Sequence, residues 1–395
     1  MPEIIIRDPE RESDWEQFER IQVDSFAIPV DTARAEVTAQ REHALTRFAF
    51  VDGKLAGGYS VFPVSQYFGG RAVPAGAIES VVTAAINRRQ GVGAALMADV
   101  PSLFQERGLF LAPLWAASPR FYRRWGWDVG DHSLLHTVKL SSLSSMRGEG
   151  SLDPAPDPDD AEALYHQVAA SWNGSICRPD WWRKLPDSGP VLPEHKYRVG
   201  WREHGELTGF IRYGQSRPKG FFGPGVINVT DLYTLSGNAM LGLLGYIGGH
   251  AAQVQEMTIR APMRHDLLYA IEDANLAITA NSGMTWMQRV TDIPGALGAR
   301  GWNPDYSGSF SLEVVDPVPG RSRTVRIEIA NGKGHAQQSA TADTRIDAGF
   351  FASWFSGSAH AELGQRLGRI RGNPATISEM DRAMDHRPVW LQDVF

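Results

Sequence analysis

The stretch from Ile78 to Leu96, IESVVTAAINRRQGVGAAL, decides how the first part of this chain folds. It opens with the β-branched residues Ile78, Val81 and Val82, a composition typical of a buried strand. It closes with a run of strong helix formers that starts at Ala94. A buried strand that passes through a short turn into a helix predicts an α/β domain with this turn at the edge of its sheet.

The turn itself, from Asn87 to Gly93, contains two arginines and two glycines. The first N–H groups of a helix have no partners within the helix and carry the positive end of its dipole. Gly91 and Gly93 lack a Cβ, so an anion can approach the backbone closely, and Arg88 and Arg89 add charge there. The turn therefore predicts a phosphate cradle, with an ordinary basic surface turn as the alternative. A Walker loop is excluded because no Gly-Lys-Ser/Thr follows, and a dinucleotide fingerprint because the third glycine is missing.

The composition narrows the class of protein. A chain of 395 residues is long enough for two to four domains, and its formal net charge of −6 favours small cationic substrates over nucleic acid. The single Cys177 excludes an intrachain disulfide framework, and no apolar run approaches the length of a membrane span. The acidic N-terminal segment is not a secretory signal, and the 11 histidines include no HExxH motif. We expect a cytoplasmic protein without a metal site, a nucleic-acid partner or a membrane partner.

A second motif follows at residues 121–127, FYRRWGW, directly after an apolar run at 108–116 that predicts another buried parallel strand. With the turn at 88–93, this order resembles the GCN5-related N-acetyltransferase (GNAT) family. In that family a Q/R-x-x-G-x-G/A loop binds the pyrophosphate of acetyl-coenzyme A (acetyl-CoA). An F-Y-x-x-x-G-F/Y/W segment then follows the next strand, where the sheet opens to admit the thioester.

Residues 141–160, SSLSSMRGEGSLDPAPDPDD, read as a linker because alternating proline and aspartate cannot hold a helix or a central strand. Beyond it the pattern predicts a second series of elements: a helix at 160–168, a hairpin at 197–213, a strand at 225–232, a helix at 237–248 and a strand at 255–259. The order resembles a second acetyltransferase-type domain without the arginine–glycine loop. We interpret it as a degenerate copy with a structural role.

The composition shifts again at residues 285–302, TWMQRVTDIPGALGARGW, which two strands and a helix follow. This segment resembles the opening of the sterol-carrier-protein-like domain of the Eis (enhanced intracellular survival) family, and the resemblance covers essentially the whole chain. It implies an α/β (α+β) fold with mixed sheets flanked by helices. The expected domains are a catalytic acetyltransferase domain at 1–148, a degenerate second one at 149–284 and a carrier-like α+β domain at 285–395.

The resemblance also implies where acetyl-CoA, the cosubstrate, binds. The family's contacts fall on a strand, on the arginine–glycine loop and on the segment after the next strand: Val81, Val82, Thr83, Arg88, Arg89, Gln90, Gly91, Val92, Gly93, Ala94, Ala117 and Ser118. The family often has arginine where this chain has Gln90. The loss of that cation is expected to weaken cofactor affinity without abolishing it.

Acetyl transfer to an amine also needs an acid and a base. A phenol of pKa about 10 can protonate a departing thiolate of pKa about 8.5, which predicts Tyr122 as the general acid, with a merely packed aromatic as the alternative. The resemblance implies that the base is the C-terminal carboxylate, here that of Phe395. The apolar lead-in at 388–391 predicts a fixed chain end, and the alternative is a frayed tail.

The resulting expectation is an acetyl-CoA-dependent N-acetyltransferase that acts on amines of small cationic, aminoglycoside-like substrates. The resemblance also implies a homohexamer. Two alternatives stay open: a lysine N-acetyltransferase that acts on proteins or peptides, and a non-catalytic protein that binds acetyl-CoA or a lipid.

Overall fold

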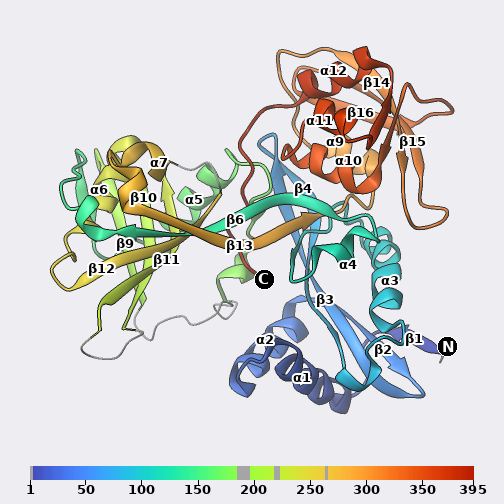
Figure 1. Ribbon diagram of the computed structural model, residues 1–395, viewed down its shortest axis with the longest axis horizontal. Coiled ribbons are helices and arrows are strands. Elements are labelled where there is room, and N and C mark those ends of the chain that lie inside the picture. The colour runs from blue at the N-terminus through green and yellow to red at the C-terminus, as the bar shows by residue number, and fades with distance from the viewer. Residues whose placement is uncertain (1–2, 185–195, 218–222, 263–265) are drawn as a thin grey trace.

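The protein forms three lobes, described by a computed structural model for residues 3–184, 196–217, 223–262 and 266–395 (Figure 1). A 13-stranded mixed sheet runs through the first two lobes, and a five-stranded sheet forms the third. No helix of the described residues is long and apolar enough to cross a membrane.

The first lobe is a mixed sheet with helices on both faces. Phe18 of α1 packs with Phe48 on one face, while Leu96 and Phe104 of α3 pack on the other. The strands follow the order β1-β2-β3-β4-β5, antiparallel except for the β4–β5 pair. The elements are β1 (Ile4–Arg7), α1 (Glu12–Phe26), α2 (Val30–His43), β2 (Leu45–Val51), β3 (Lys54–Phe68), β4 (Arg71–Thr83), α3 (Val92–Arg107), β5 (Leu114–Ala116), α4 (Pro119–Arg123) and β6 (Asp128–Lys139).

The second lobe repeats this order, as expected from the sequence. A helix, a hairpin, a strand, a helix and a strand follow one another, and α6 spans the same residues, 237–248, that the pattern predicted. The elements are β7 (Ser151–Asp153), α5 (Pro158–Ala169), β8 (Ile176–Cys177), β9 (Lys196–Glu203), β10 (Glu206–Ser216), β11 (Gly225–Thr234), α6 (Gly237–Gly248), β12 (Val254–Ala261), α7 (Leu267–Ala270), α8 (Ala274–Ala277) and β13 (Ile278–Gln288).

The two lobes share the long strands β6 and β13, which cross the middle of the molecule (Figure 1). β13 inserts between β5 and β6: Trp286 pairs with Trp115 on one side and with Asp131 on the other. The far half of β6 pairs with β12 of the second lobe. Each lobe therefore completes its sheet with strands that the other lobe also uses, and the two cannot move independently.

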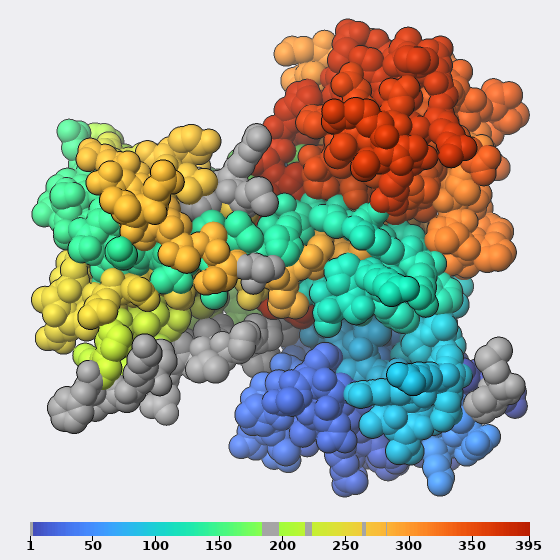
Figure 2. Space-filling model, viewed as in Figure 1, coloured from blue at the N-terminus to red at the C-terminus, as the bar shows by residue number. Residues whose placement is uncertain are grey.

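The third lobe packs four helices against the sheet β16-β15-β14-β17-β18. It rests on β6 (Figure 2), where the Ser353 hydroxyl donates to the Val129 carbonyl at 2.8 Å and Arg369 pairs with Asp128 at 2.5 Å. Its elements are α9 (Ile293–Ala299), β14 (Gly308–Val315), β15 (Arg323–Ala330), β16 (Lys333–Gln338), β17 (Thr344–Asp347), α10 (Ala348–Ser356), α11 (Ala361–Arg366), β18 (Ile370–Gly372) and α12 (Pro374–Ala383).

Candidate active site

The first lobe opens where β4 and β5 separate. Ile78 pairs with Leu114, and the Ile78 N–H donates to the Pro113 carbonyl at 2.9 Å. Beyond this pair, no further β4–β5 pairing is found among the residues that the structure describes. The backbone of Val81–Thr83 therefore faces a gap in the sheet, where a bound chain can pair with it.

A β-bulge shapes β4 at this gap. Ser80 has a φ of +50°, and the register against β3 shifts by one residue there. As a result Ile78 and Val81 both pack on the α3 face, while Val82 packs on the α1 face. The buried Gln40 of α2 donates to the Ser80 hydroxyl at 2.9 Å. Bulges re-aim side chains and are common beside active sites, so this edge of the sheet is a candidate functional site.

The predicted cradle lies at the start of α3, beside the gap. Gly91 occupies the N-cap position with a φ of +95°, which explains why glycine stands there. No side chain caps this helix and no acidic residue lies in its first turn. Arg88 and Arg89 are exposed and form no ion pair with any residue that the structure describes. The N-terminus of α3 thus presents uncompensated N–H groups and two free guanidinium groups, the features of an anion site.

The remaining residues of the predicted loop hold it in shape. The Gln90 amide donates to the Ile86 carbonyl at 3.0 Å and accepts from the Asn87 amide at 3.4 Å, so this side chain braces the turn. A Cβ on Gly93 would lie 3.3 Å from the ring of Phe121, so this glycine lets α4 approach α3 closely. Val92 is buried and Ala94 half-buried in the first turn of the helix.

The corresponding helix of the second lobe, α6, has an N-terminus that is capped by side chains of the same chain. At the N-terminus of α6, the Ser236 hydroxyl accepts from the Ala239 N–H at 3.0 Å and donates to Glu203. Hydrogen bonds from Ser236 and Thr208 hold the pKa of Glu203 below its ordinary value, so a carboxylate sits at this helix end. The chain's own side chains therefore compensate the helix dipole at this helix end, so the N-terminus of α6 is not an open phosphate cradle.

Tyr122 lies on α4, beyond the end of β5, while Ala117 and Ser118 form the exposed link between the two. Its ring packs edge-on against Phe121 and Trp127, and the residue is 9% exposed. Its hydroxyl has no hydrogen-bond partner among the described residues. Burial raises the pKa of Tyr122 to about 12, so the phenol keeps its proton at neutral pH. Such a group can donate a proton but is not a base.

The last eight residues, 388–395, which we term the C-terminal strap, leave the third lobe and run between the other two. The Trp390 N–H donates to the Asn173 carbonyl, and the Asn173 N–H to the Pro388 carbonyl. The Trp115 indole N–H of β5 donates to the Asp393 carbonyl at 2.9 Å. The strap is therefore fixed, and its end lies beside the strand that borders the gap.

The ring of Phe395, which ends the strap, packs edge-on against Trp182 at 6.3 Å. Trp182 in turn contacts Phe62 of β3, which pairs with Ala77 of β4 one residue before Ile78. The strap end therefore lies close to the place where β4 and β5 separate.

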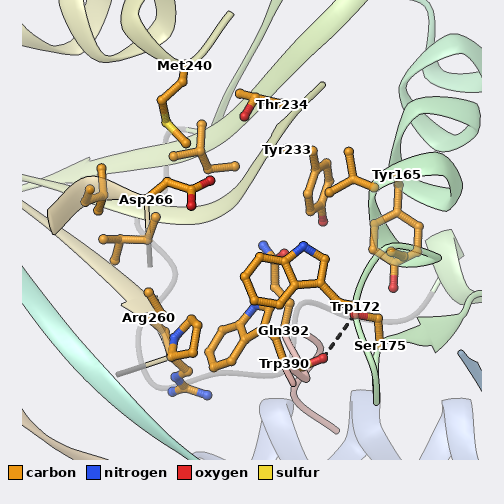
Figure 3. Close-up of a pocket in the computed structure, with 17 residues that line it drawn as sticks. Tyr165, Trp172, Ser175, Tyr233, Thr234, Met240, Arg260, Asp266, Trp390 and Gln392 are labelled. Atoms are coloured by element: carbon orange, nitrogen blue, oxygen red, sulfur yellow. Dashed lines mark hydrogen bonds between the residues drawn. The ribbon is translucent and has the colours of Figure 1, made fainter. Parts of the chain in front are cut away.

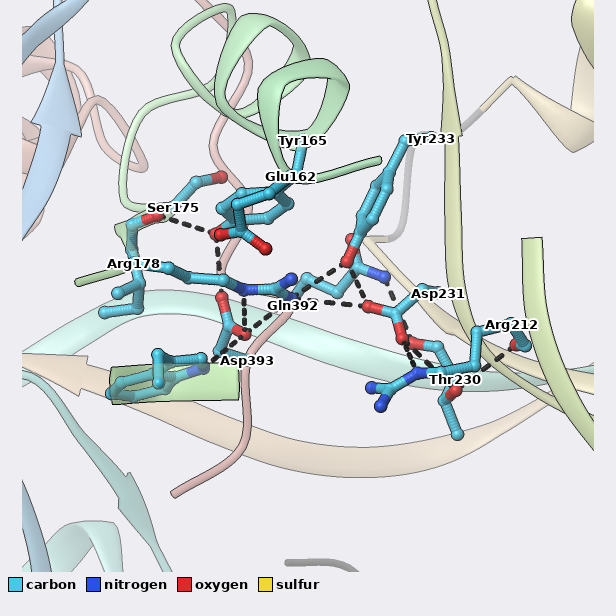
Figure 4. Close-up of polar contacts among 12 residues, drawn as sticks. Glu162, Tyr165, Ser175, Arg178, Arg212, Thr230, Asp231, Tyr233, Gln392 and Asp393 are labelled. Atoms are coloured by element: carbon cyan, nitrogen blue, oxygen red, sulfur yellow. Dashed lines mark hydrogen bonds and ion pairs between the residues drawn. The ribbon is translucent and has the colours of Figure 1, made fainter. Parts of the chain in front are cut away.

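A buried ionic cluster holds the strap (Figure 4). Arg178 pairs with Asp393 at 2.7 Å and with Asp231 at 3.3 Å, and the Tyr165 hydroxyl donates to Asp393 at 2.9 Å. Burial disfavours the charge of Asp231, but Arg212 and Arg178 outweigh it and hold the pKa of this carboxyl below its ordinary value. A buried pair of this kind fixes geometry more than it adds stability.

Glu79 is a candidate that sequence reasoning passed over. It lies on β4 between Ile78 and the bulge, facing α2, where Glu36 and Gln40 are its neighbours. Burial and the charge of Glu36 raise the pKa of Glu79 to about 8, while a hydrogen bond from Gln40 acts against them. A carboxyl with such a pKa beside the gap can exchange a proton near neutral pH. The available signal was a lone acidic residue inside a β-branched run.

No group of three or more His, Cys, Asp or Glu side chains in the described part of the chain could hold a metal ion.

Comparison with known proteins gives a family assignment to most of the chain. Residues 6–130 and 174–290 each match an acetyltransferase (GNAT) domain, and residues 293–392 match a sterol carrier protein domain. GNAT domains use acetyl-CoA, and the free cradle and the parted strands of the first lobe fit that group.

Full-length relatives agree with this assignment. An uncharacterized N-acetyltransferase from Streptomyces avermitilis is 27% identical, covering 89% of this chain and 88% of its own. Another from Streptomyces griseus is 25% identical and covers 98% of both.

Two solved structures share the fold over the full length of both chains, each at 22% identity. They are a GCN5-related N-acetyltransferase from Anabaena variabilis, with a TM-score of 0.91, and Eis1 from Mycobacterium abscessus, with a TM-score of 0.78. The chain is therefore an acetyltransferase enzyme built from two GNAT domains followed by a sterol carrier protein domain.

Proposed function

We propose that this enzyme is an Eis-type N-acetyltransferase that transfers acetyl groups from acetyl-CoA to amines of small polycationic molecules such as aminoglycosides. The observation that carries the proposal is the uncapped N-terminus of α3 with its two free arginines, which opens beside the parted strands β4 and β5. The same helix end in the second lobe is closed by Ser236 and Glu203, whereas the corresponding helix end in the first lobe is open.

The first lobe has the parts that hold the cosubstrate. Arg88, Arg89 and the first N–H groups of α3 would bind its pyrophosphate, and the backbone of Val81–Thr83 would pair with its arm along the gap. Ala117 and Ser118 border the same opening from the β5 side. Bound acetyl-CoA supplies an activated acetyl thioester.

Tyr122 serves as the general acid. Its phenol proton is retained at neutral pH because burial raises the pKa to about 12. The hydroxyl, which has no partner among the described residues, is free to donate to a thiolate sulfur. If Tyr122 had only a packing role, its ring alone would suffice. Removal of the hydroxyl therefore distinguishes a general acid from a packing residue.

The carboxylate that follows Phe395 serves as the base. A terminal carboxyl has a pKa of about 3.3–3.7 and is charged at neutral pH, whereas Glu79, with a pKa of about 8, is mostly protonated there. Trp115 and Arg178 hold Asp393, two residues before it, beside β5, which supports this role. The terminal carboxylate can hold an ammonium group of the acceptor and take its proton, directly or through water.

The charges near the site support a cationic acceptor. The terminal carboxylate is charged at neutral pH, and the whole chain has a net charge of −6. From the resemblance to the Eis family we also propose that the enzyme is a cytoplasmic homohexamer. Analytical ultracentrifugation would test the oligomeric state.

The proposal is tested by thiol release from acetyl-CoA with a panel of acceptors: kanamycin, a simple diamine and a lysine-containing peptide. We expect kanamycin to give the highest kcat/KM. A preference for the peptide would replace the proposed acceptor with protein lysines, and no turnover with any amine would overturn the proposal.

A matched pair of tags tests the base. A few residues appended after Phe395 move the carboxylate while every side chain stays, so a C-terminal tag should abolish most activity and an N-terminal tag should not. Full activity of the C-terminally tagged enzyme would refute the terminal carboxylate as base.

A further inference from the structure

The second lobe contains a hollow of about 110 Å³ that the proposed reaction does not use (Figure 3). It lies where β11 and β12 part: they pair from Gly225 to Val229 on β11, and the last residues of both strands then line its walls. Met240 of α6 closes one end, and Trp172, just beyond α5, forms another wall. The hollow thus occupies the place in this lobe that the β4–β5 gap occupies in the first.

The walls are mostly apolar and aromatic. Trp172, Trp390 and Tyr233 present their rings to the hollow, and Leu232 and Met240 add aliphatic surface. The hydroxyl of Tyr233 is bonded to Asp231 in the ionic cluster, so this residue offers the hollow its ring. Aromatic rings of this kind stack on planar ligands and form edge-to-face contacts with them.

The charges around the hollow argue for a neutral occupant. The positive N-terminus of α6, which could otherwise bind a phosphate, is compensated by the carboxylate of Glu203. Among the described residues that line the wall, the charged ones are Arg260 and Asp266, which carry opposite signs. A volume of about 110 Å³ is of the same order as the apolar cavity of about 150 Å³ that binds one benzene ring, so the hollow suits a ligand of single-ring size.

The hollow shares one wall with the C-terminal strap. Trp390 and Gln392 line it, the Trp390 carbonyl accepts from the Ser175 hydroxyl at 3.0 Å, and Gln392 donates to the Thr230 carbonyl at 3.1 Å. Asp393, the next residue, sits in the ionic cluster. An occupant therefore contacts the segment that positions the chain end.

We propose that this hollow of the second GNAT domain is a binding site for a small neutral aromatic molecule, and that its occupant holds the C-terminal strap in place. The site differs from the acetyl-CoA cradle in lobe, in charge and in ligand class. Binding there requires no acetyl transfer, so it stands or falls independently of the proposed reaction.

The test uses phenol as the probe and the full chain without acetyl-CoA or acceptor. Ligand-observed NMR titration should show saturable binding to the unaltered protein. Met240→Trp fills the hollow from α6 and should weaken phenol binding at least tenfold, whereas Leu241→Trp, at the neighbouring position outside the lining, should not. Val168→Trp fills the hollow from α5 and serves as a second variant should Met240→Trp fail to fold.

Amide hydrogen exchange measures directly whether the occupant holds the C-terminal strap in place. Phenol should slow amide exchange in the peptide that contains Trp390–Asp393, and this slowing should vanish in the filled variant. Cyclohexanol, of similar size but without a ring current or π face, should bind several-fold more weakly. No saturable binding, equal binding by the filled variant, equal binding of cyclohexanol, or unchanged strap exchange would each overturn the proposal.

Discussion

Two carboxyl groups lie near the gap in the first lobe, and a single pH profile separates their roles. The perturbation is Glu79→Gln, which keeps the size of the side chain and removes its titration. The assay is kcat/KM for acetyl transfer between pH 5.5 and 9, with an alkoxyamine as acceptor so that the acceptor itself stays unprotonated. The profile then reports the enzyme's own base.

The structure gives the size of the effect. If Glu79 were the base, its pKa of about 8 would make kcat/KM fall about tenfold per pH unit well below that value, roughly 50-fold between pH 8 and pH 6. The terminal carboxylate, with a pKa of about 3.3–3.7, is fully ionised across this range. We therefore expect a flat profile for the unaltered enzyme and kcat/KM within about threefold of it for Glu79→Gln.

A falling limb centred near pH 8 that disappears in Glu79→Gln would refute the terminal carboxylate as the base and assign that role to Glu79. The matched control is Glu36→Gln, which removes a neighbouring charge but leaves Glu79 in place. That variant should shift such a limb to lower pH, because the charge of Glu36 helps to raise the pKa of Glu79.

Further predictions address the acid, the cradle, the strap and the stability of the first lobe. Tyr122→Phe should lower kcat by about 10²–10⁴ with little change in Tm, and near-normal turnover would return this residue to a packing role. Arg89→Ala should raise the KM for acetyl-CoA, by roughly 1–3 kcal/mol of lost binding, more than it lowers kcat; an unchanged KM would move the cofactor elsewhere. Asp393→Asn should speed amide exchange in the strap and lower kcat at least tenfold, because Arg178 loses one of its two carboxylates; normal exchange would show that the backbone bonds suffice. The free energy of unfolding of Glu79→Gln, measured relative to that of the unaltered protein, should increase from pH 5 to pH 9. The raised pKa of Glu79 means that its protonated form stabilises the fold at low pH and that this stability is lost as pH rises through about 8, which differential calorimetry at both pH values would detect.

The sequence predicted the features that depend on local chemistry. Glycines at 91 and 93 and two adjacent arginines indicated the cradle, and the structure shows why: the N-cap position requires a φ of +95°, and α4 needs room beside α3. The order of elements in both GNAT domains could also be read because hydrophobic periodicity is a property of short segments. The domain boundaries and the roles of individual site residues remain predictions.

Local sequence patterns could not predict that the two GNAT domains share strands. β13 pairs with β5, more than 150 residues earlier in the chain, and nothing in the composition of 278–288 distinguishes a strand that serves two sheets. The strap posed the same difficulty. Asp393 bonds Tyr165 across 228 positions of sequence, so the choice between a fixed and a frayed end depended on partners that only the fold brings together.

These long-range contacts indicate what the third and second lobes would contribute to the proposed reaction in the first lobe. The third lobe is fastened to β6 by Ser353 and Arg369, and from there the strap passes the ionic cluster of the second lobe on its way to β5. Each lobe thus fixes one section of the path that ends at Phe395. If the proposed terminal base is correct, the second GNAT domain contributes to the reaction by holding the chain end, because its Arg178 and Tyr165 bind Asp393 two residues before Phe395.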